Sequence, residues 1–158
     1  MRAIELTKGM VATVDDEDYQ SVSRHKWHAL VGTHHVYAVR SVRDDGRKRM
    51  IYMHRQITNA PDGMDVDHIN GDTVDNSRAN LRVSTRSDNM CNQGPSRAST
   101  SGYKGVRFHK KHQRWYAAIK KEGKSHHLGH YKTAEEAARA YDKAARNLHG
   151  EFAYQNFQ

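Results

Sequence analysis

A carboxylate and an imidazole stand side by side in the middle of the chain, at Asp67 and His68, and two carboxamides follow at Asn80 and Asn89. Cleaving a phosphodiester requires an activated water, charge neutralisation on the phosphate and stabilisation of the leaving oxygen. Asp67 and Asn89 offer oxygen ligands, which suit a hard cation such as Mg²⁺ or Mn²⁺. His68, held beside the cation, could take the proton from the attacking water. These residue types in this order predict a one-metal phosphodiester-cleaving site.

Residues 53–92 resemble the HNH endonuclease family, in the subgroup whose last motif residue is Asn. The resemblance implies that Asp67 and Asn89 are metal ligands, that His68 is the general base, and that Asn80 pins the loop by hydrogen bonding. Taken singly, each Asn could be an ordinary turn residue, so the set as a whole carries the resemblance. The matching pieces are Met53-His54-Arg55, Val66-Asp67-His68-Ile69-Asn70-Gly71, Asn76 and Asn80-Leu81-Arg82.

The net charge of +8 lies entirely in the C-terminal part of the chain. Residues 1–93 hold 13 Lys or Arg and 13 Asp or Glu, whereas residues 94–158 hold 13 and 5, an excess of 13 − 5 = 8. Such asymmetry indicates a module that binds a polyanion, attached to a charge-balanced module. A basic face that only keeps the protein in solution is the simpler alternative.

The small, polar and aperiodic residues 94–102 read as a linker at the point where the charge changes. We therefore expect an N-terminal α+β support module at 1–52, a nuclease module at 53–93, and a DNA-binding domain at 103–158. Within the first part, strand patterns at 3–14 and a helix at 16–27 are expected. A hairpin turning at Asp44-Asp45-Gly46 is expected next, and residues 53–58 are expected to lead into a short helix. Two roles are open for residues 1–52, namely support of the nuclease loop and contact with DNA phosphate.

Residues 103–158 have the pattern of three short strands and one helix. Period-two alternation places one apolar set on one face and Arg107, His109, Arg114 and Lys120 on the other. The helix begins at Thr133 with a capping box to Glu136 and presents an alanine-rich stripe to the sheet. The inward-facing set is Val106, Phe108, Trp115, Ala117, Ile119 and Leu128.

This C-terminal part resembles the AP-two/ethylene-response-factor DNA-binding domain. The matches include Tyr103-Lys104-Gly105-Val106-Arg107, Trp115-Tyr116-Ala117-Ala118-Ile119 and Thr133-Ala134-Glu135-Glu136-Ala137-Ala138. In that family the sheet lies in the major groove. The resemblance implies DNA contacts from Lys104, Arg107, His109, Arg114, Lys120, Ser125, His127 and Tyr141. Several of these depart from the plant pattern, so the preferred DNA sequence should differ.

The expected fold is α+β: a ββα-metal nuclease module followed by a three-stranded antiparallel sheet packed on one helix. The expected cofactor is Mg²⁺ or Mn²⁺ and not zinc, since Cys91 is the only cysteine. The N-terminus has no secretory pattern and no apolar run is long enough to span a membrane. We therefore expect a cytoplasmic protein that is not secreted, and a monomer, because no dimer signal is visible.

The sequence thus predicts a metal-dependent DNA endonuclease held on duplex DNA by its C-terminal sheet, and the resemblance implies a homing-type enzyme of a phage or mobile element. The alternative is a non-catalytic transcription regulator in which the HNH part is a degenerate scaffold. RNA as the substrate is a third possibility, which the basic sheet alone leaves open.

Overall fold

The computed structural model describes residues 1–157; residue 158, the last of the expected DNA-binding domain, lies outside them. The chain divides into two compact units, Met1–Arg86 and Ser87–Gln158. This boundary precedes the expected linker, so residues 87–93 belong to the second unit rather than to the first. The fold is mixed α+β with small antiparallel sheets, which confirms the expected class. Among the described residues, no helix is long and apolar enough to cross a membrane.

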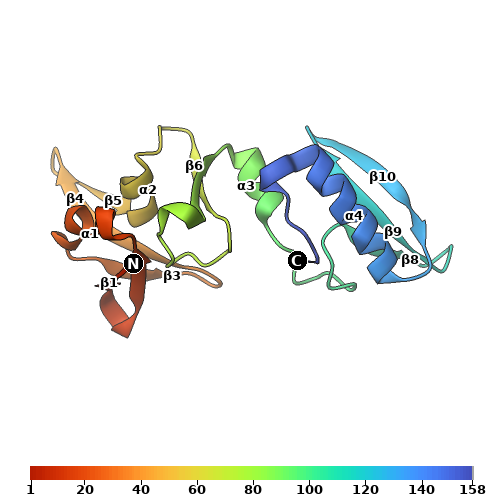
Figure 1. The fold of residues 1–158 in the computed structure, drawn as a ribbon, viewed down its shortest axis with the longest axis horizontal. Helices are drawn as coiled ribbons and strands as arrows, with labels where there is room; N and C mark the ends of the chain where they lie inside the picture. Colours follow the sequence, from red (N-terminus) through yellow and green to blue (C-terminus); the bar gives the residue numbers. More distant parts are fainter. Residues whose placement is uncertain (158) are drawn as a thin grey trace. The chain divides into compact units, whose positions relative to one another are not determined.

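The first unit is built from three small antiparallel sheets and two helices (Figure 1). One sheet is a two-stranded hairpin, the second has the strand order β3-β4-β5, and the third pairs two strands that lie far apart in sequence. The elements are β1 (Arg2–Glu5), β2 (Val11–Val14), α1 (Asp16–Ser23), β3 (His28–Val31), β4 (Val36–Asp44), β5 (Arg47–Tyr52), α2 (Met53–Thr58), β6 (Asp65–His68) and β7 (Leu81–Ser84).

The hairpin between β4 and β5 turns where the sequence predicts. Asp45 and Gly46 have φ angles of 47° and 76°, the two positive values that a two-residue hairpin turn of the favoured type requires. The helix predicted at 16–27 is shorter than expected, because α1 ends at Ser23. Trp27 lies in the core instead, and its indole N–H donates to the carbonyl of Val22 at 2.8 Å.

A single apolar core holds the first unit together and fixes the helix that precedes the candidate site. Met53 and Ile57, one helical turn apart on α2, are both buried in this core. Their burial sets the rotation of α2, and His54 is buried as well. The remaining core members are Ile4, Leu6, Ala12, Val14, Val22, Trp27, Ala29, Ala38 and Leu81.

The second unit contains a three-stranded antiparallel sheet in the order β10-β9-β8, with α4 lying across one face (Figure 1). Its core joins the sheet to an alanine-rich helix stripe that includes Ala137, Ala138 and Ala145, all fully buried. The helix starts with the expected capping box, in which the Thr133 side chain accepts from the Glu136 amide. The elements are α3 (Arg86–Asn92), β8 (Val106–His109), β9 (Arg114–Lys121), β10 (Lys124–Tyr131) and α4 (Ala134–His149).

Two details of this sheet differ from simple alternation. Phe108, expected in the core, is 38% exposed and packs edge-on against Trp115, with ring centroids 5.1 Å apart. In β10 the register shifts between His127 and Gly129, so Leu128 is an extra residue, a β-bulge. Leu128 still packs against the core, as alternation predicts, but the bulge changes which of the later residues face solvent.

A buried carboxylate ties the C-terminal segment to this unit. Asp142 on α4 is 2% exposed and accepts hydrogen bonds from the backbone amides of Asn156 and Phe157 at 2.9 and 3.0 Å. The Asn156 side chain in turn accepts from the Lys104 amide at 2.7 Å. This network holds the end of the chain against α4 and against the loop before β8.

Candidate nuclease site and DNA-facing surface

The candidate nuclease residues Asp67 and His68 end strand β6, which pairs with β7 so that Asp67 faces Arg82 and His68 faces Leu81. The Asp67 carboxylate accepts from Arg82 Nε at 2.9 Å and from its terminal nitrogen at 2.6 Å. Asp67 and His68 are only 6% and 5% exposed. The sequence pattern did not assign this role to Arg82, because a cross-strand partner is visible only once the strand register is known.

Asn80 cross-links the loop that joins these two strands. Its side-chain oxygen accepts from the Asn70 amide at 2.9 Å, and its side-chain nitrogen donates to the Asp75 carbonyl at 2.8 Å. Its backbone carbonyl accepts from the Ile69 amide, also at 2.9 Å. Because Asn80 is itself buried, these bonds hold the two ends of the loop together next to His68.

His68 lies in a small aromatic cluster that the sequence did not predict. Its ring centroid is 5.2 Å from that of His54 and 6.3 Å from that of Tyr37. Burial lowers the pKa of His68, an effect that Asn76 and nearby carboxylates oppose. Burial also raises the pKa of Tyr37, and Tyr52 and Asp67 add to that rise. At neutral pH the imidazole of His68 is therefore held in the unprotonated form that a base requires.

His54 is neutral for the same reason. Burial, followed by the charges of His68 and Arg55, lowers the pKa of His54 to about 3. The ring packs against Tyr52 and Tyr37, with centroids 5.3 and 5.6 Å away. A neutral, packed imidazole cannot offset phosphate charge, so the structure favours a packing role for His54.

Asn89 lies on α3 and belongs to the second unit. The structure defines each unit by itself, so the pairing of Asn89 with Asp67 stays a prediction.

Among the described residues, one group of three acidic side chains has its oxygens close enough for a metal ion, namely Asp15, Glu17 and Asp18. The guanidinium of Arg78 already pairs with this group, because its Nε and one terminal nitrogen each donate to an oxygen of Asp18 at 2.8 Å.

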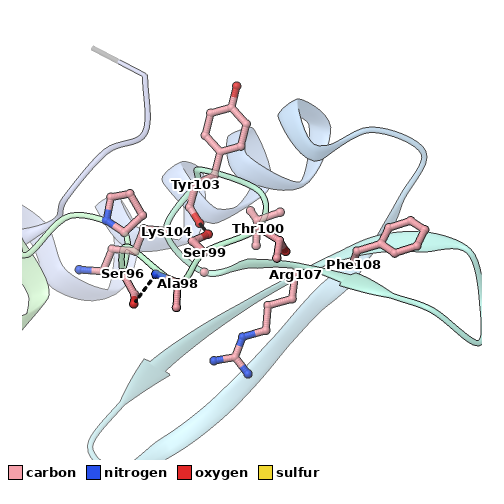
Figure 2. Close-up of a pocket in the computed structure, with 11 residues that line it drawn as sticks. Ser96, Ala98, Ser99, Thr100, Tyr103, Lys104, Arg107 and Phe108 are labelled. Carbon is pink, nitrogen blue, oxygen red and sulfur yellow. Dashed lines mark hydrogen bonds between the residues drawn. The ribbon is translucent and has the colours of Figure 1, made fainter.

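Six of the eight residues expected to contact DNA share the solvent face of the C-terminal sheet. The strand register pairs His109 with Arg114, and Ser125 with Lys120, on the face opposite the helix. Arg107 pairs with Tyr116 on the same face, and Figure 2 shows Arg107 and Phe108 leaving β8 on opposite sides. The six are Arg107, His109, Arg114, Lys120, Ser125 and His127.

Lys104 does not belong to that face. Its ammonium group donates to the carbonyls of Cys91 at 2.6 Å and Gln93 at 2.5 Å, and to that of Met90 at 3.4 Å. Met90 and Cys91 lie in the last turn of α3, and Gln93 directly follows the helix. Lys104 therefore caps the C-terminal end of α3. Burial lowers the pKa of Lys104 to about 8, while the carbonyl partners favour its charged form.

Tyr141 is also absent from the solvent face, because α4 lies on the other side of the sheet. Its side chain is 3% exposed and belongs to the core. Gly105 makes room for it: φ there is +74°, and an added Cβ would collide with the Tyr141 ring. Burial raises the pKa of Tyr141 further above its ordinary value. A buried ring is not available to a DNA phosphate.

The face carries three further residues that were not among the expected DNA contacts. Tyr116 lies in the middle of β9, stacked on His127 with ring centroids 5.9 Å apart. His130 faces the same side because the bulge at Leu128 shifts it into register with Tyr116. His112, in the turn after β8, packs on His109 at 4.5 Å between centroids. Strict alternation along β10 places His130 on the core face of the sheet. His112 lies in a turn, so alternation assigns it to neither face.

A hollow of about 440 Å³ opens beside β8, between that strand and the preceding loop (Figure 2). Small polar side chains such as Ser96, Ser99 and Thr100 line it together with Tyr103. A hydrogen bond from the Ala98 amide to the Ser96 hydroxyl shapes the loop. The residues that line the hollow include no carboxylate or imidazole, so it offers no acid or base for catalysis.

Comparison with known proteins matches residues 59–91 to the HNH endonuclease model and residues 101–151 to the AP2 domain. The protein named Uncharacterized HNH endonuclease L560, from Acanthamoeba polyphaga mimivirus, is 32% identical over 152 residues, which are 94% of this chain and 76% of that protein. The chain belongs to the HNH endonuclease family. This confirms the family resemblance for both parts of the sequence.

Other relatives match shorter stretches of this HNH protein. Protein 3.8 of Escherichia phage T7 is 33% identical over 93 residues, covering 59% of this chain and 76% of its own length. The AP2-like ethylene-responsive transcription factor TOE2 of Arabidopsis thaliana is 45% identical over 65 residues, 41% of this chain but only 13% of the plant protein. No solved structure matches. The two domains together indicate a DNA-binding nuclease.

Proposed function

We propose that this HNH protein is a metal-dependent endonuclease that hydrolyses DNA phosphodiester bonds and is positioned on duplex DNA by its C-terminal sheet. The observation that carries the proposal is the buried neighbouring pair Asp67 and His68, set on a strand and loop that Arg82 and Asn80 brace. The matched HNH region contains this pair. The β6–β7 pair followed by α3 has the element order of the proposed ββα-metal module.

In this proposal, Asp67 and Asn89 hold a Mg²⁺ or Mn²⁺ ion through oxygen atoms, the donor type that both ions prefer. Such an ion, when bound, lowers the pKa of a water and neutralises phosphate charge. His68 accepts a proton from the attacking water, for which its burial in the unprotonated form prepares it. Asn80 does no chemistry and keeps the loop, and with it His68, in one position.

Arg82 has a second role in the proposed site. A buried carboxylate without a counter-charge is costly, and the Arg82 guanidinium supplies that counter-charge to Asp67. The two-point contact with one oxygen also fixes the rotation of the carboxylate. Arg82 thus prepares Asp67 for a cation rather than contacting the DNA itself.

The solvent face of the sheet supplies the proposed DNA contacts. Arg107 and Arg114 can pair with guanine through two hydrogen bonds or bind phosphate, whereas Lys120 binds phosphate as a point charge. Linking this face to the nuclease unit raises the local concentration of the nuclease on DNA, so a weakly binding catalytic unit suffices. The viral sources of two relatives are in keeping with a homing-type enzyme of a phage or mobile element.

The proposal is tested by cleavage of supercoiled plasmid with Mg²⁺, with Mn²⁺ and with EDTA. We expect nicked or linear product only with a metal ion, and a loss of about 10²-fold or more in rate for His68→Ala. His34→Ala, which removes an exposed histidine of the same unit, is the matched control and should cut like the wild type.

Two outcomes would contradict this function. Cleavage that survives His68→Ala would remove His68 from the chemistry. Plasmid binding without cleavage under any metal condition would favour the alternative, a DNA-binding regulator built on an inactive HNH scaffold. The form of the product also tells whether one strand or both are cut.

A further inference from the structure

Four histidines gather on the solvent face of the C-terminal sheet, around Tyr116. His109 comes from β8, His112 from the turn that follows, and His127 and His130 from β10. Their ring centroids are 4.5 Å apart for His109 and His112, 6.0 Å for His109 and His130, and 5.8 Å for His112 and His130. His127 adjoins the triangle, 4.7 Å from His130.

We propose that His109, His112 and His130 form a surface binding site for one divalent transition-metal ion of the zinc, nickel or copper class. Imidazole nitrogens suit these ions, whereas Mg²⁺ and Mn²⁺ prefer the oxygen donors of the nuclease site. The two sites therefore differ in donor chemistry and in the ions they select.

The ring spacing carries this proposal. With metal–nitrogen distances of about 2.0–2.1 Å and tetrahedral angles, two imidazoles on one ion have centroids about 5 Å apart. The three measured separations bracket that value. A shared ion requires the ligand atoms to approach one another closely. Among the described residues, the ligand atoms of Asp15, Glu17 and Asp18 all lie within 4.8 Å of one another, whereas the ring nitrogens of His109, His112 and His130 do not. Rotation about the side-chain bonds of these surface residues is therefore part of binding.

One ring is already partly oriented. The backbone amide of His112 donates a hydrogen bond to Nδ1 of His109 at 3.3 Å, so the proton of the neutral ring lies on Nε2. Binding an ion through His109 therefore requires this long hydrogen bond to break, so that one ring nitrogen can bind while the other carries the proton. Three protein ligands also leave a fourth position for water.

A positive side chain lies beside the proposed ligands. Arg114, paired with His109 across β8 and β9, opposes a cation and keeps the affinity modest.

The β-bulge makes the site possible. If β10 paired regularly, without a bulge at Leu128, Gly129 rather than His130 would stand opposite Tyr116. Sequence spacing gives no sign of the site, because its ligands come from three separate segments of the chain. It is therefore compatible with the absence of cysteine-based zinc motifs.

The site is tested by titrating Zn²⁺ into the untagged full-length protein at pH 7.5 by isothermal calorimetry, without DNA. The wild type should show a binding event that is absent in His112→Gln/His130→Gln. His126→Gln is the matched control, because His126 is an exposed histidine of the same strand that pairs with Ile119 on the other face. That control should bind like the wild type.

One further arm sharpens the test. Arg114→Gln should tighten binding, since it removes a positive charge beside the site. An unchanged binding event in the double variant, with unchanged circular dichroism, would overturn the proposal. Because neither DNA nor cleavage enters the measurement, its failure leaves the proposed nuclease function untouched.

Discussion

The two units place their functional side chains in opposite environments. In the first unit, Asp67, His68 and Asn80 are buried and joined to their surroundings by hydrogen bonds and an ion pair. In the second, Arg107, Arg114 and Lys120 are exposed on a sheet whose other face alone is packed. Proton transfer needs groups held in one geometry, whereas groove contact needs side chains that can reach a partner.

This difference predicts that substitutions in the two units will have different kinds of effect. Changing one member of the buried network should disturb stability and geometry together, because each group is held by the others. Changing one exposed residue should alter DNA affinity by a modest and independent amount while leaving the fold unchanged.

The largest effect on stability is expected for Arg82→Met, which leaves the buried Asp67 carboxylate without its guanidinium partner. Breaking a buried ion pair from one side costs about 3–5 kcal/mol. Urea unfolding in a Trp115→Phe background, where Trp27 reports on the first unit, measures this loss. Arg43→Met, at an exposed position on β4, is the control and should change stability by less than about 0.5 kcal/mol. Equal stabilities for the two variants would mean that the pair is not coupled to the fold.

Asn80→Ala should come next, because it leaves the Asn70 amide and the Asp75 carbonyl without their side-chain partner. We expect a loss of about 2 kcal/mol, the cost of unsatisfied polar groups in a partly buried loop. Amide hydrogen exchange is the sharper measurement, since protection at Asn70 should fall more than protection at Val106 in the other unit. Unchanged protection at Asn70 would show that Asn80 does not hold the loop.

Acidification should destabilise the first unit through His54. Its pKa is lowered to about 3 in the folded state, from 6.5 as its ordinary value. The unfolded chain therefore binds more protons between those values, and stability falls as the pH drops from 6.5 toward 3, by at most about 1.4 kcal/mol per pH unit for one group. The lowered pKa of His68 acts in the same direction.

Unfolding free energies measured in EDTA at pH 7, 6 and 5 check this dependence. His54→Gln should show a shallower slope, by up to one proton, because the variant has no group to titrate at that position. The same slope in both proteins would mean that His54 is not kept neutral by burial.

The smallest effect is expected for Tyr141→Phe, since the Tyr141 ring lies in the core under α4. The Tyr141→Phe variant should bind duplex DNA with the affinity of the wild type in a fluorescence anisotropy titration. Lys120→Ala, by contrast, should weaken binding and reduce the salt dependence of the affinity by about one phosphate contact. Weaker binding by Tyr141→Phe with an intact fold would place its hydroxyl at the DNA after all.

Features encoded by adjacent residues were predictable from the sequence. The Asp45-Gly46 turn and the Thr133 capping box both follow from local backbone preferences and were confirmed. The end of α1 was not predictable, because Trp27 continues the helical pattern but is drawn into the core by packing. Local preference gave way there to tertiary contact.

The functional residues divide in the same way. The motif placed Asp67 and His68 together because they are neighbours in sequence, but the partner of Asp67 depends on strand register. Lys104 looked like a DNA contact until the fold put the end of α3 within its reach. The bulge at Leu128, which decides the face of His130, has no strong local signal.

The division of labour between the units is the central claim, and one paired measurement tests it most directly. Single-turnover cleavage rate at saturating protein and DNA affinity are measured on the same duplex for His68→Ala and for Arg107→Ala/Arg114→Ala. The account predicts that His68→Ala loses about 10²-fold or more in rate at unchanged affinity. It predicts that the arginine variant loses about tenfold or more in affinity while cutting bound DNA at the wild-type rate. If His68→Ala binds more weakly but cuts normally once bound, or if the arginine variant binds as the wild type does, the proposed division is wrong.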